Sequence, residues 1–347
     1  MMGQSENAAP IRAMILAAGL GTRMRPLTNY RAKPALPVCG RPVISLLLEL
    51  LAAHGVREVL INLHHQPDSI REAVEADHPE FLSIEWSEEP SPLGTGGGIE
   101  RAAEFLRGTA DCLVMAGDML LDCDLTDLLT RHRTSGRDVT LILRDDIRGE
   151  HFGTVGLDAA QRVTRIGKRI LDEPKDESGA AEEVSRGLFT SLRFFRRDAL
   201  DDFPSPEDEA FEDLRDWLAP RVASDGLTLG AEILSESESV WEPVGTPAEY
   251  LEANLAPPHL PSLGGSVTAW GGEVTPGGLA AGYVVAGAAS LPGDVELERC
   301  VVWDGEKLPA GFRGIDGVYA GGAFHACPGA IRKPESSRSG SVIGSAQ

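Results

Sequence analysis

The sequence has few cysteines, and they form no recognisable pairs. Its cysteines are odd in number and scattered without a C-x-x-C pair, at Cys39, Cys112, Cys123, Cys300 and Cys327. This usage fits neither a disulfide framework nor a zinc site, and it is typical of a reducing compartment. We expect these residues to be small members of the hydrophobic core.

Long hydrophobic runs and a signal peptide are also missing. A membrane-spanning helix needs roughly 18 apolar residues, and the longest candidate, residues 44–53, is interrupted by Ser45 and Glu49. At the N-terminus, Glu6 and Asn7 stand where a signal peptide would need a charged start and an apolar stretch. We therefore expect a soluble, cytoplasmic protein without a membrane partner.

Basic residues are scarce overall but concentrated near the N-terminus. The formal net charge is -21, which argues against a nucleic-acid partner because duplex binding needs a basic face. Residues 8–48 nevertheless contain no Asp or Glu, and they carry Arg12, Arg23, Arg25, Arg31, Lys33 and Arg41. A basic segment in an acidic protein indicates a site for an anionic ligand such as a polyphosphate. The alternative is that acidic residues are absent here by chance and because part of the segment is a buried strand.

Apolar runs alternate with amphipathic segments along most of the chain. The pattern predicts strands at residues 11–18, 58–63, 82–86, 111–116 and 139–144. It predicts helices at residues 42–53, 68–76, 95–106 and 125–133. This alternation indicates an α/β fold over residues 11–255: a mostly parallel, Rossmann-like sheet with helices on both faces. Less regular strands follow at 154–157, 163–166 and 188–195, with a helix near 209–222.

The C-terminal quarter has a different composition. Residues 256–263 are Pro-rich and read as a linker. In residues 264–328, single apolar residues recur about every five to seven positions between Gly, Pro and Ala, a spacing that resembles a short β-solenoid. A loose Gly-rich sandwich is the alternative. We expect this part to serve regulation or homo-oligomer assembly, and the polar residues 329–347 to form a disordered tail.

A glycine-rich turn, Gly19-Leu20-Gly21-Thr22-Arg23, follows the first predicted strand. Backbone N–H groups of such a turn lie beyond the sheet, where ligands of open α/β sheets bind, and glycines let phosphate oxygens approach closely. A dinucleotide-binding turn would need a small residue in place of Met24 and an acid roughly 20 residues later. A P-loop would end in Gly-Lys-Ser/Thr. Gly-x-Gly alone therefore does not identify the ligand.

The surrounding residues are more specific. Residues 16–28 read LAAGLGTRMRPLT and residues 33–38 read KPALPV, a combination that resembles the signature of sugar-1-phosphate nucleotidyltransferases, particularly the mannose-1-phosphate guanylyltransferase-like group. Further similarity at 89–97, 117–120, 152–155 and 241–254 extends the resemblance over residues 11–255. It implies nucleotidyl transfer from an NTP to a hexose 1-phosphate with release of pyrophosphate. A β-solenoid after the catalytic domain is also usual in this family.

The resemblance implies roles for individual residues. Arg23 would hold the β- and γ-phosphates, and Lys33 would contact the α-phosphate and the leaving oxygen. Gly153 and Lys168 correspond to sugar-binding positions. The nucleotide would be bound by Leu16, Ala18, Gly19, Gly21, Thr22, Glu89, Pro92, Gly94 and Thr95. Physical chemistry agrees with such a set, because joining two anions calls for cations and oriented N–H donors rather than a general base.

Glu89 bears on the choice of base. A carboxylate accepts from both N1–H and N2–H of guanine, whereas adenine offers no such donor pair, so Glu89 favours GTP. A surface glutamate beside Glu88 is the alternative.

Asp118 and Glu242 are the expected metal ligands. Asp118 ends a buried strand and can bind Mg²⁺, although a turn-forming Asp is the alternative. Family members usually have a second ligand Asp where Pro243 stands, in Trp241-Glu242-Pro243-Val244-Gly245. Glu242 would replace it only with a local kink, because adjacent strand residues point to opposite faces. A non-catalytic paralogue that binds nucleotide sugar and regulates a partner enzyme is the alternative function.

Overall fold

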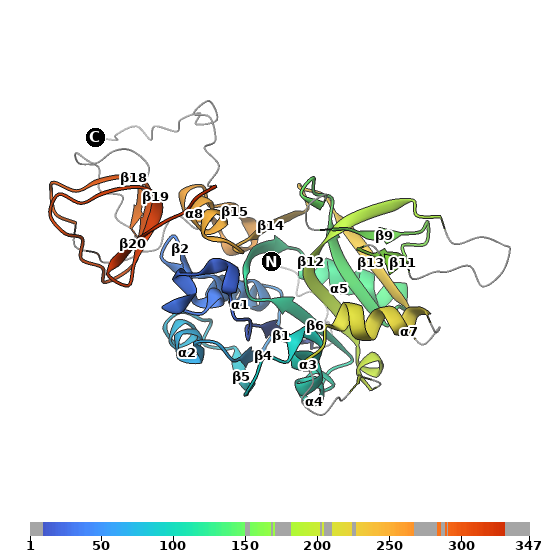
Figure 1. Cartoon of the computed structure of the whole chain (residues 1–347). Coiled ribbons are helices and arrows are strands. Elements are labelled where there is room, and N and C mark those ends of the chain that lie inside the picture. Colours follow the sequence, from blue (N-terminus) through green and yellow to red (C-terminus); the bar gives the residue numbers. More distant parts are fainter. Residues whose placement is uncertain are drawn as a thin grey trace, which may run out of the picture.

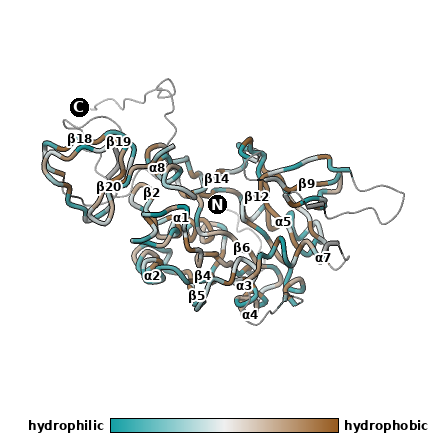
Figure 2. The backbone as a smooth tube through the Cα atoms, in the orientation of Figure 1, coloured by the Kyte–Doolittle hydropathy of each residue, from teal (hydrophilic) through white to brown (hydrophobic). Residues whose placement is uncertain are grey.

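A mixed β-sheet with helices on both faces forms the centre of the molecule (Figure 1). The computed structural model describes residues 10–149, 153–167, 169–170, 182–201, 203–204, 210–223, 227–266, 283–285, 289 and 291–329. In Figure 2, hydrophobic stretches lie around α1 and β4 in the middle of the molecule. None of the described helices is long and apolar enough to cross a membrane.

The parallel half of the sheet is built around β1 (Arg12–Leu16). Strands β4 (Glu58–Leu63) and β6 (Asp111–Ala116) flank β1 in parallel, and β5 (Ser83–Glu88) pairs with β4. Strands β1, β4 and β6 are mostly apolar and mostly buried, as expected for strands covered on both faces, whereas β5 is only partly buried. The parallel α/β prediction is therefore confirmed for this half.

Helices cover the two faces of these strands. Along β1, Ala13 and Ile15 belong to one hydrophobic core and Met14 to another, because alternate side chains leave opposite faces. The first core includes residues of α1 (Val43–Ala53), α2 (Pro67–Ala76), α5 (Leu125–Ser135) and α8 (Pro247–Leu255). The second includes residues of α3 (Gly94–Arg101), α4 (Ala103–Leu106), the π-helix η5 (Asp213–Leu218) and α7 (Ala219–Ala223).

The other half of the sheet is mostly antiparallel, which corrects the expectation of a mostly parallel sheet there. The long β12 (Ser185–Arg196) runs antiparallel to β6, β8 (Val139–Arg144) and β9 (Val155–Leu157). Strands β10 (Val163–Ile166) and β11 (Arg169–Ile170) continue beyond β9, and β13 (Leu229–Leu234) pairs in parallel with β8. Hydrophobic runs define strands, but they do not fix the direction in which the chain re-enters the sheet.

A separate two-stranded ribbon brings a distant segment next to Asp118. Strand β7 (Met119–Cys123) pairs antiparallel with β14 (Ser239–Pro243), so that Pro243 lies opposite Met119. Beyond β14, the Val244 amide donates to the Asp118 carbonyl at 3.0 Å. The segment between β1 and α1 contains three short 3-10 helices and two short strands: η1 (Thr22–Met24), η2 (Leu27–Asn29), η3 (Lys33–Ala35), β2 (Pro37–Val38) and β3 (Arg41–Pro42). A further 3-10 helix, η4 (Arg197–Leu200), follows β12.

Several polar and sulfur-containing residues have structural roles. Asp124 caps α5 by accepting from the Asp127 amide at 2.9 Å. Asp122 accepts from the Ser262 amide at 2.8 Å and from its hydroxyl at 2.6 Å, and so fixes the segment after α8. All five cysteines are free and buried.

The C-terminal region contains a small sheet where a solenoid was expected. Strands β17 (Tyr283–Val285), β18 (Glu296–Val302) and β19 (Arg313–Ala320) are parallel, but β20 (Ala323–Ala326) returns antiparallel to β19. The parallel strands fit stacked coils and β20 does not, so the sheet is not established as a solenoid. In the expected linker lie β15 (His259–Leu260) and η6 (Pro261–Leu263), followed by β16 (Gly265–Ser266). Residues 267–282 and the expected tail at 330–347 lie outside the described residues.

Candidate active site

A cavity of about 670 Å³ lies beyond the carboxyl ends of β1 and β6. It is lined by all the residues expected to bind the nucleotide: Leu16, Ala18, Gly19, Gly21, Thr22, Glu89, Pro92, Gly94 and Thr95. Arg23, Lys33 and Asp118 line the same cavity. The structure therefore brings together residues from four separate parts of the sequence to which the family resemblance gives roles.

Gly21 shapes the glycine-rich loop that lines one side of this cavity. Its backbone has φ of +60°, and a Cβ at this position would lie 2.8 Å from Cγ2 of the buried Thr28. The Gly21 carbonyl accepts from the Thr28 hydroxyl at 2.9 Å and from the Met24 amide at 2.9 Å. A side chain at position 21 would thus be strained and would displace Thr28.

Lys33 and Asp118 form an ion pair at the junction of two cavities. The Lys33 Nζ lies 2.5 Å from Oδ2 of Asp118. The Lys33 side chain is only 10% exposed, whereas the Asp118 side chain is 39% exposed. A second cavity of about 350 Å³ shares Arg23, Lys33 and Asp118 with the first and is also lined by Gly153. The expected catalytic cations thus lie between the expected nucleotide and sugar regions.

Of the two residues expected to bind the sugar, the structure describes only Gly153. The Gly153 amide donates to the Gly149 carbonyl at 2.9 Å, so its N–H is already engaged. Its exposed backbone, with φ of +87°, still lines the second cavity. Lys168 lies outside the described residues.

Glu89 is held rigidly in the wall of the first cavity. One carboxylate oxygen accepts from Nδ2 of Asn62 at 2.7 Å and the other from the Leu93 amide at 3.1 Å. Asn62, which the sequence analysis did not single out, also accepts from the Ala17 amide at 2.7 Å. A carboxylate has about four acceptor positions, so Glu89 retains capacity for a ligand. Asn62 was detectable as a polar residue inside the apolar run of β4.

The metal ligands predicted from sequence are only partly brought together. Asp118 lines both cavities, and Mg²⁺ is commonly held by one or two carboxylates plus substrate phosphates, so its donor chemistry fits. In the described part of the chain, no group of three or more His, Cys, Asp or Glu side chains could hold a metal by themselves. Any metal bound at Asp118 would therefore need further ligands from the substrates or water.

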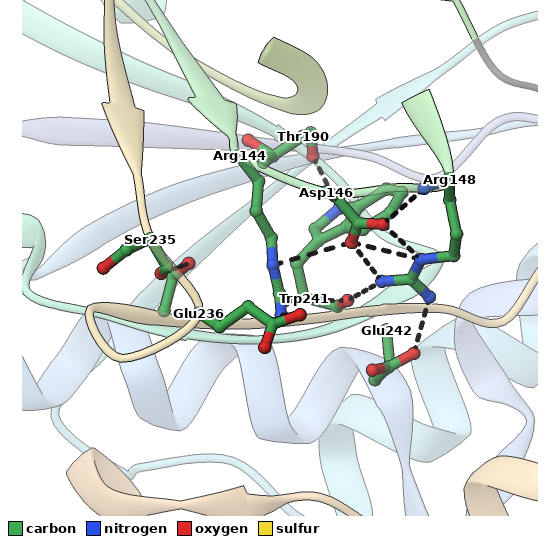
Figure 3. Close-up of polar contacts among 9 residues, drawn as sticks. Arg144, Asp146, Arg148, Thr190, Ser235, Glu236, Trp241 and Glu242 are labelled. Atoms are coloured by element: carbon green, nitrogen blue, oxygen red, sulfur yellow. Dashed lines mark hydrogen bonds and ion pairs between the residues drawn. The ribbon is translucent and has the colours of Figure 1, made fainter. Parts of the chain in front are cut away.

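Glu242 does not reach the cavity. The β7–β14 pairing runs from Ser239 to Pro243 without a register shift, so the kink that would turn Glu242 toward Asp118 is absent. Pro243 and Trp241 line the second cavity and Glu242 does not, as strand alternation requires. Instead, Oε2 of Glu242 accepts from Arg148 at 2.8 Å (Figure 3).

Arg148 holds Glu242 within a charged network that lines neither cavity. Its guanidinium donates to both oxygens of the buried Asp146 and to the Trp241 carbonyl, and it lies 5.1 Å over the Trp241 ring. Hydrogen bonding to Asp146 raises the pKa of Arg148, and the same contact lowers the pKa of Asp146. Freeing Glu242 for a metal would break this charged network.

Other charged residues in the cavities were missed by the sequence analysis. Arg193, on β12, is buried and pairs with Asp213 at 2.8 Å. Oδ1 of Asp213 accepts from the Thr95 hydroxyl at 2.6 Å. Both residues line the first cavity, and Glu249 lines the second. No local pattern signalled Arg193 or Asp213, because their partners are distant in sequence.

The structure thus combines an α/β sheet with a cavity beyond the carboxyl ends of its parallel strands, where open α/β sheets bind their ligands. The pattern of the nucleotidyl transferase family matches residues 12–258, and the chain belongs to this family. It is 32% identical over 312 residues to a mannose-1-phosphate guanylyltransferase of Mycobacterium tuberculosis, covering 87% of this chain and 82% of the relative. It is 31% identical over 257 residues to a UTP--glucose-1-phosphate uridylyltransferase of Synechocystis, covering 70% and 62%.

A solved structure shares the fold. The crystal structure of HddC from Yersinia pseudotuberculosis complexed with GMP-PN has a TM-score of 0.55 and 22% identity, covering 70% of this chain and 98% of HddC. The family match and the sequence relatives place this chain among the sugar-1-phosphate nucleotidyltransferases.

Proposed function

We propose that this protein transfers a nucleotidyl group from a nucleoside triphosphate, with GTP favoured, to a hexose 1-phosphate. The products are an NDP-sugar and pyrophosphate. The observation that carries the proposal is the position of Lys33, Arg23 and Asp118 where the two cavities meet. The relatives named for guanylyl and uridylyl transfer support the same type of reaction.

The residues meet the needs of a reaction between two anions. An oxygen of the sugar phosphate attacks the α-phosphorus, the bond to the bridging oxygen of the β-phosphate breaks, and pyrophosphate leaves with the electron pair. The attacking phosphate is already ionised at neutral pH, so no general base is needed. Lys33 stabilises the charge that builds up on the leaving oxygen, more strongly because it is largely shielded from water. Arg23, exposed in the cavity wall, holds the outer phosphates.

Asp118 is the residue proposed to hold Mg²⁺ with the substrate phosphates. Bound there, the metal would supply further neutralisation of phosphate charge. Before substrates bind, Asp118 and Lys33 balance each other's charge within the cavity. The ion pair thereby keeps the Lys33 ammonium directed at the cavity.

Preference for GTP is proposed from Glu89. Asn62 and the Leu93 amide hold its carboxylate in a fixed orientation, which is what discrimination between bases requires. Guanine presents two N–H donors to such a carboxylate and adenine does not. The guanylyltransferase relatives favour the same choice, and the uridylyltransferase relative makes UTP the main competitor.

One observation favours a second candidate function. Pro243 lines the cavity where a carboxylate would serve as the second metal ligand, and Glu242 is engaged by Arg148. A chain with one metal ligand could bind a nucleotide sugar and regulate a partner enzyme without turning over.

A substrate panel decides between the two candidates. Pyrophosphate release is measured for GTP, UTP, dTTP, ATP and CTP against mannose, glucose and N-acetylglucosamine 1-phosphates, with and without Mg²⁺. Lys33→Met is the matched inactive control. Release that requires Mg²⁺ and is strongest with GTP supports the proposal. Nucleotide-sugar binding by calorimetry without release for any pair would instead support the regulatory candidate.

A further inference from the structure

The segment that carries Lys33 has supports on two sides. We define the Lys33 loop as residues 27–38, which contain η2, η3 and β2. On one side, the Ala32 amide donates to the Ser69 hydroxyl at 2.8 Å, and a ring nitrogen of His65 contacts the Thr28 carbonyl at 2.7 Å. The other side faces the C-terminal sheet, formed by β17–β20, which lies beside α8 (Figure 1).

Residues just before Lys33 pack on the C-terminal sheet. The Tyr30 ring meets the Trp303 ring edge-on, with centroids 6.3 Å apart, and lies 5.7 Å from the His325 ring. The Arg31 guanidinium lies 4.9 Å over the Trp303 ring, a cation–π contact. A side chain on Gly321 would overlap the Tyr30 ring, so the two surfaces fit closely at this point.

A hydrogen-bonded chain connects Trp303 to the residues just after Lys33. The indole Nε1 donates to the Tyr250 hydroxyl at 2.9 Å, and that hydroxyl donates to the Pro37 carbonyl at 2.6 Å. Trp303 is 2% exposed and Tyr250 is fully buried. Burial raises the pKa of Tyr250, so its hydroxyl keeps the proton that it donates. The direction of the whole chain is therefore fixed: indole to phenol to carbonyl.

The helix that carries Tyr250 also reaches the site itself. The first turn of helix α8 contains Glu249, whose carboxylate accepts from the Gly245 amide at 2.8 Å. Glu249 and Gly245 line the second cavity together with Lys33. Tyr250 follows directly, so the contact with Trp303 holds the same helix turn that supports this cavity wall. Asn254, on the next turn, accepts from the Cys39 amide at 2.8 Å, just past the end of the loop.

From these contacts we infer that Trp303 is a positioning residue for Lys33, and that the C-terminal sheet is thereby needed for the chemical step. Trp303 contacts the loop before Lys33 through Tyr30 and Arg31, and after Lys33 through Tyr250. Misplacement of a reacting group by about 1 Å can cost roughly 10²-fold in rate, so holding both ends of the loop matters. The inference rests on the proposed function only for its kinetic consequence.

Two substitutions separate the ring contacts from the hydrogen bond. Trp303→Phe keeps an aromatic ring for Tyr30 and Arg31 but loses the N–H donated to Tyr250. Trp303→Ala loses both. The matched controls are Trp86→Phe and Trp86→Ala, because Trp86 lies on β5 and also has a cation above its ring, Arg71 at 4.8 Å, but this cation is not part of the Lys33 loop. The full chain is used throughout.

Two readouts are taken on each variant. The first is steady-state pyrophosphate release, giving kcat and KM for the NTP. The second is hydrogen–deuterium exchange of the peptide covering residues 27–38, which needs no turnover. We expect Trp303→Ala to lower kcat about 10-fold or more with KM for the NTP changed less than about 3-fold, and Trp303→Phe to lower kcat a few-fold. Exchange in residues 27–38 should rise in both, and in neither Trp86 variant.

The outcomes distinguish the inference from the proposed function. Unchanged exchange in residues 27–38 in both Trp303 variants overturns the inference, whatever the kinetics show. Faster exchange with unchanged kcat also overturns it, because the contact would then be merely structural. If the wild type releases no pyrophosphate with any substrate pair, the proposed function fails, while the exchange measurement still decides whether Trp303 orders the Lys33 loop.

Discussion

Replacing Lys33 with methionine tests the chemistry of the cavity most directly, because methionine retains an unbranched side chain and removes the charge. Two unit charges about 4 Å apart interact by about 4 kcal/mol at an effective dielectric constant of 20. Lys33 is 8% exposed, so a value of this order applies better here than the value for bulk water. Only the part of this interaction energy that is gained as negative charge builds up on the leaving oxygen lowers the barrier, and only this part changes kcat. A loss of about 3 kcal/mol corresponds to a fall in kcat of roughly 10²-fold.

The same substitution should have little effect on folding. Its partner Asp118 has a side chain that is 39% exposed, so water can solvate the carboxylate once the ammonium is gone. Removing a partly exposed ion pair typically costs about 1 kcal/mol or less. A large loss of activity in a protein of nearly unchanged stability therefore points to chemistry rather than to misfolding.

The assay compares pyrophosphate release at saturating substrates for Lys33→Met, Arg23→Ala and Arg25→Ala, with thermal melts on each. Arg25 is the matched control, since it is exposed, lies two residues from Arg23 and lines neither cavity. Arg23→Ala should also lower turnover, but less than Lys33→Met because Arg23 is exposed to water. A kcat for Lys33→Met within 3-fold of wild type would refute the assigned role of Lys33.

Three further predictions concern the base, the metal and acid stability. GTP should outcompete ATP and UTP, and Glu89→Gln should reduce this preference for GTP because an amide replaces one acceptor oxygen with a donor; a wild type that prefers ATP, UTP or dTTP would contradict this. Pro243 lines the cavity beside Asp118, so Pro243→Asp should raise turnover or lower the Mg²⁺ concentration needed, with Pro243→Ala as control and equal behaviour of the two as the contrary result. His132 is fully buried, its Nδ1 lies 2.7 Å from the Thr140 hydroxyl, and burial lowers its pKa to about 4 from 6.5. At a pH between these two pKa values, the histidine is protonated in the unfolded chain and neutral in the folded chain. Acid therefore favours the unfolded chain, and the free energy of unfolding should fall by about 3 kcal/mol as the pH drops from 7 to 4. Urea titrations of wild type and His132→Gln at each pH isolate this contribution, and parallel pH profiles would contradict it.

The central strands of the fold follow closely from local sequence. The predicted bounds 58–63, 111–116 and 139–144 coincide with β4, β6 and β8. Each is a run of mostly apolar residues, as a strand buried on both faces requires. The ribbon of β7 and β14 was not predicted, because β7 follows β6 after only two residues and β14 ends in a proline.

The residues of the candidate site also differ in whether local sequence predicts them. Residues within one loop, such as Gly19, Gly21 and Arg23, form a recognisable pattern because their chemistry depends on short spacing. Arg193 and Asp213 do not, because they are brought together only when β12 and η5 pack against each other. A buried arginine in a strand has no local signature that distinguishes it from a surface one until its partner is known.

The position of Trp303 shows why the role of the C-terminal part could not be predicted from composition. The sequence of residues 265–311 contains no charged constellation that could do chemistry, and assembly or regulation is therefore the natural expectation for that part. A residue can affect a reaction without reacting, however, when it fixes the loop that carries the reacting group. Here one indole contacts Tyr30, Arg31 and Tyr250, so two segments of the chain that flank Lys33 depend on a side chain some 270 residues away. This dependence arises from tertiary contacts, so neither the periodicity nor the charge pattern of the sequence predicts it.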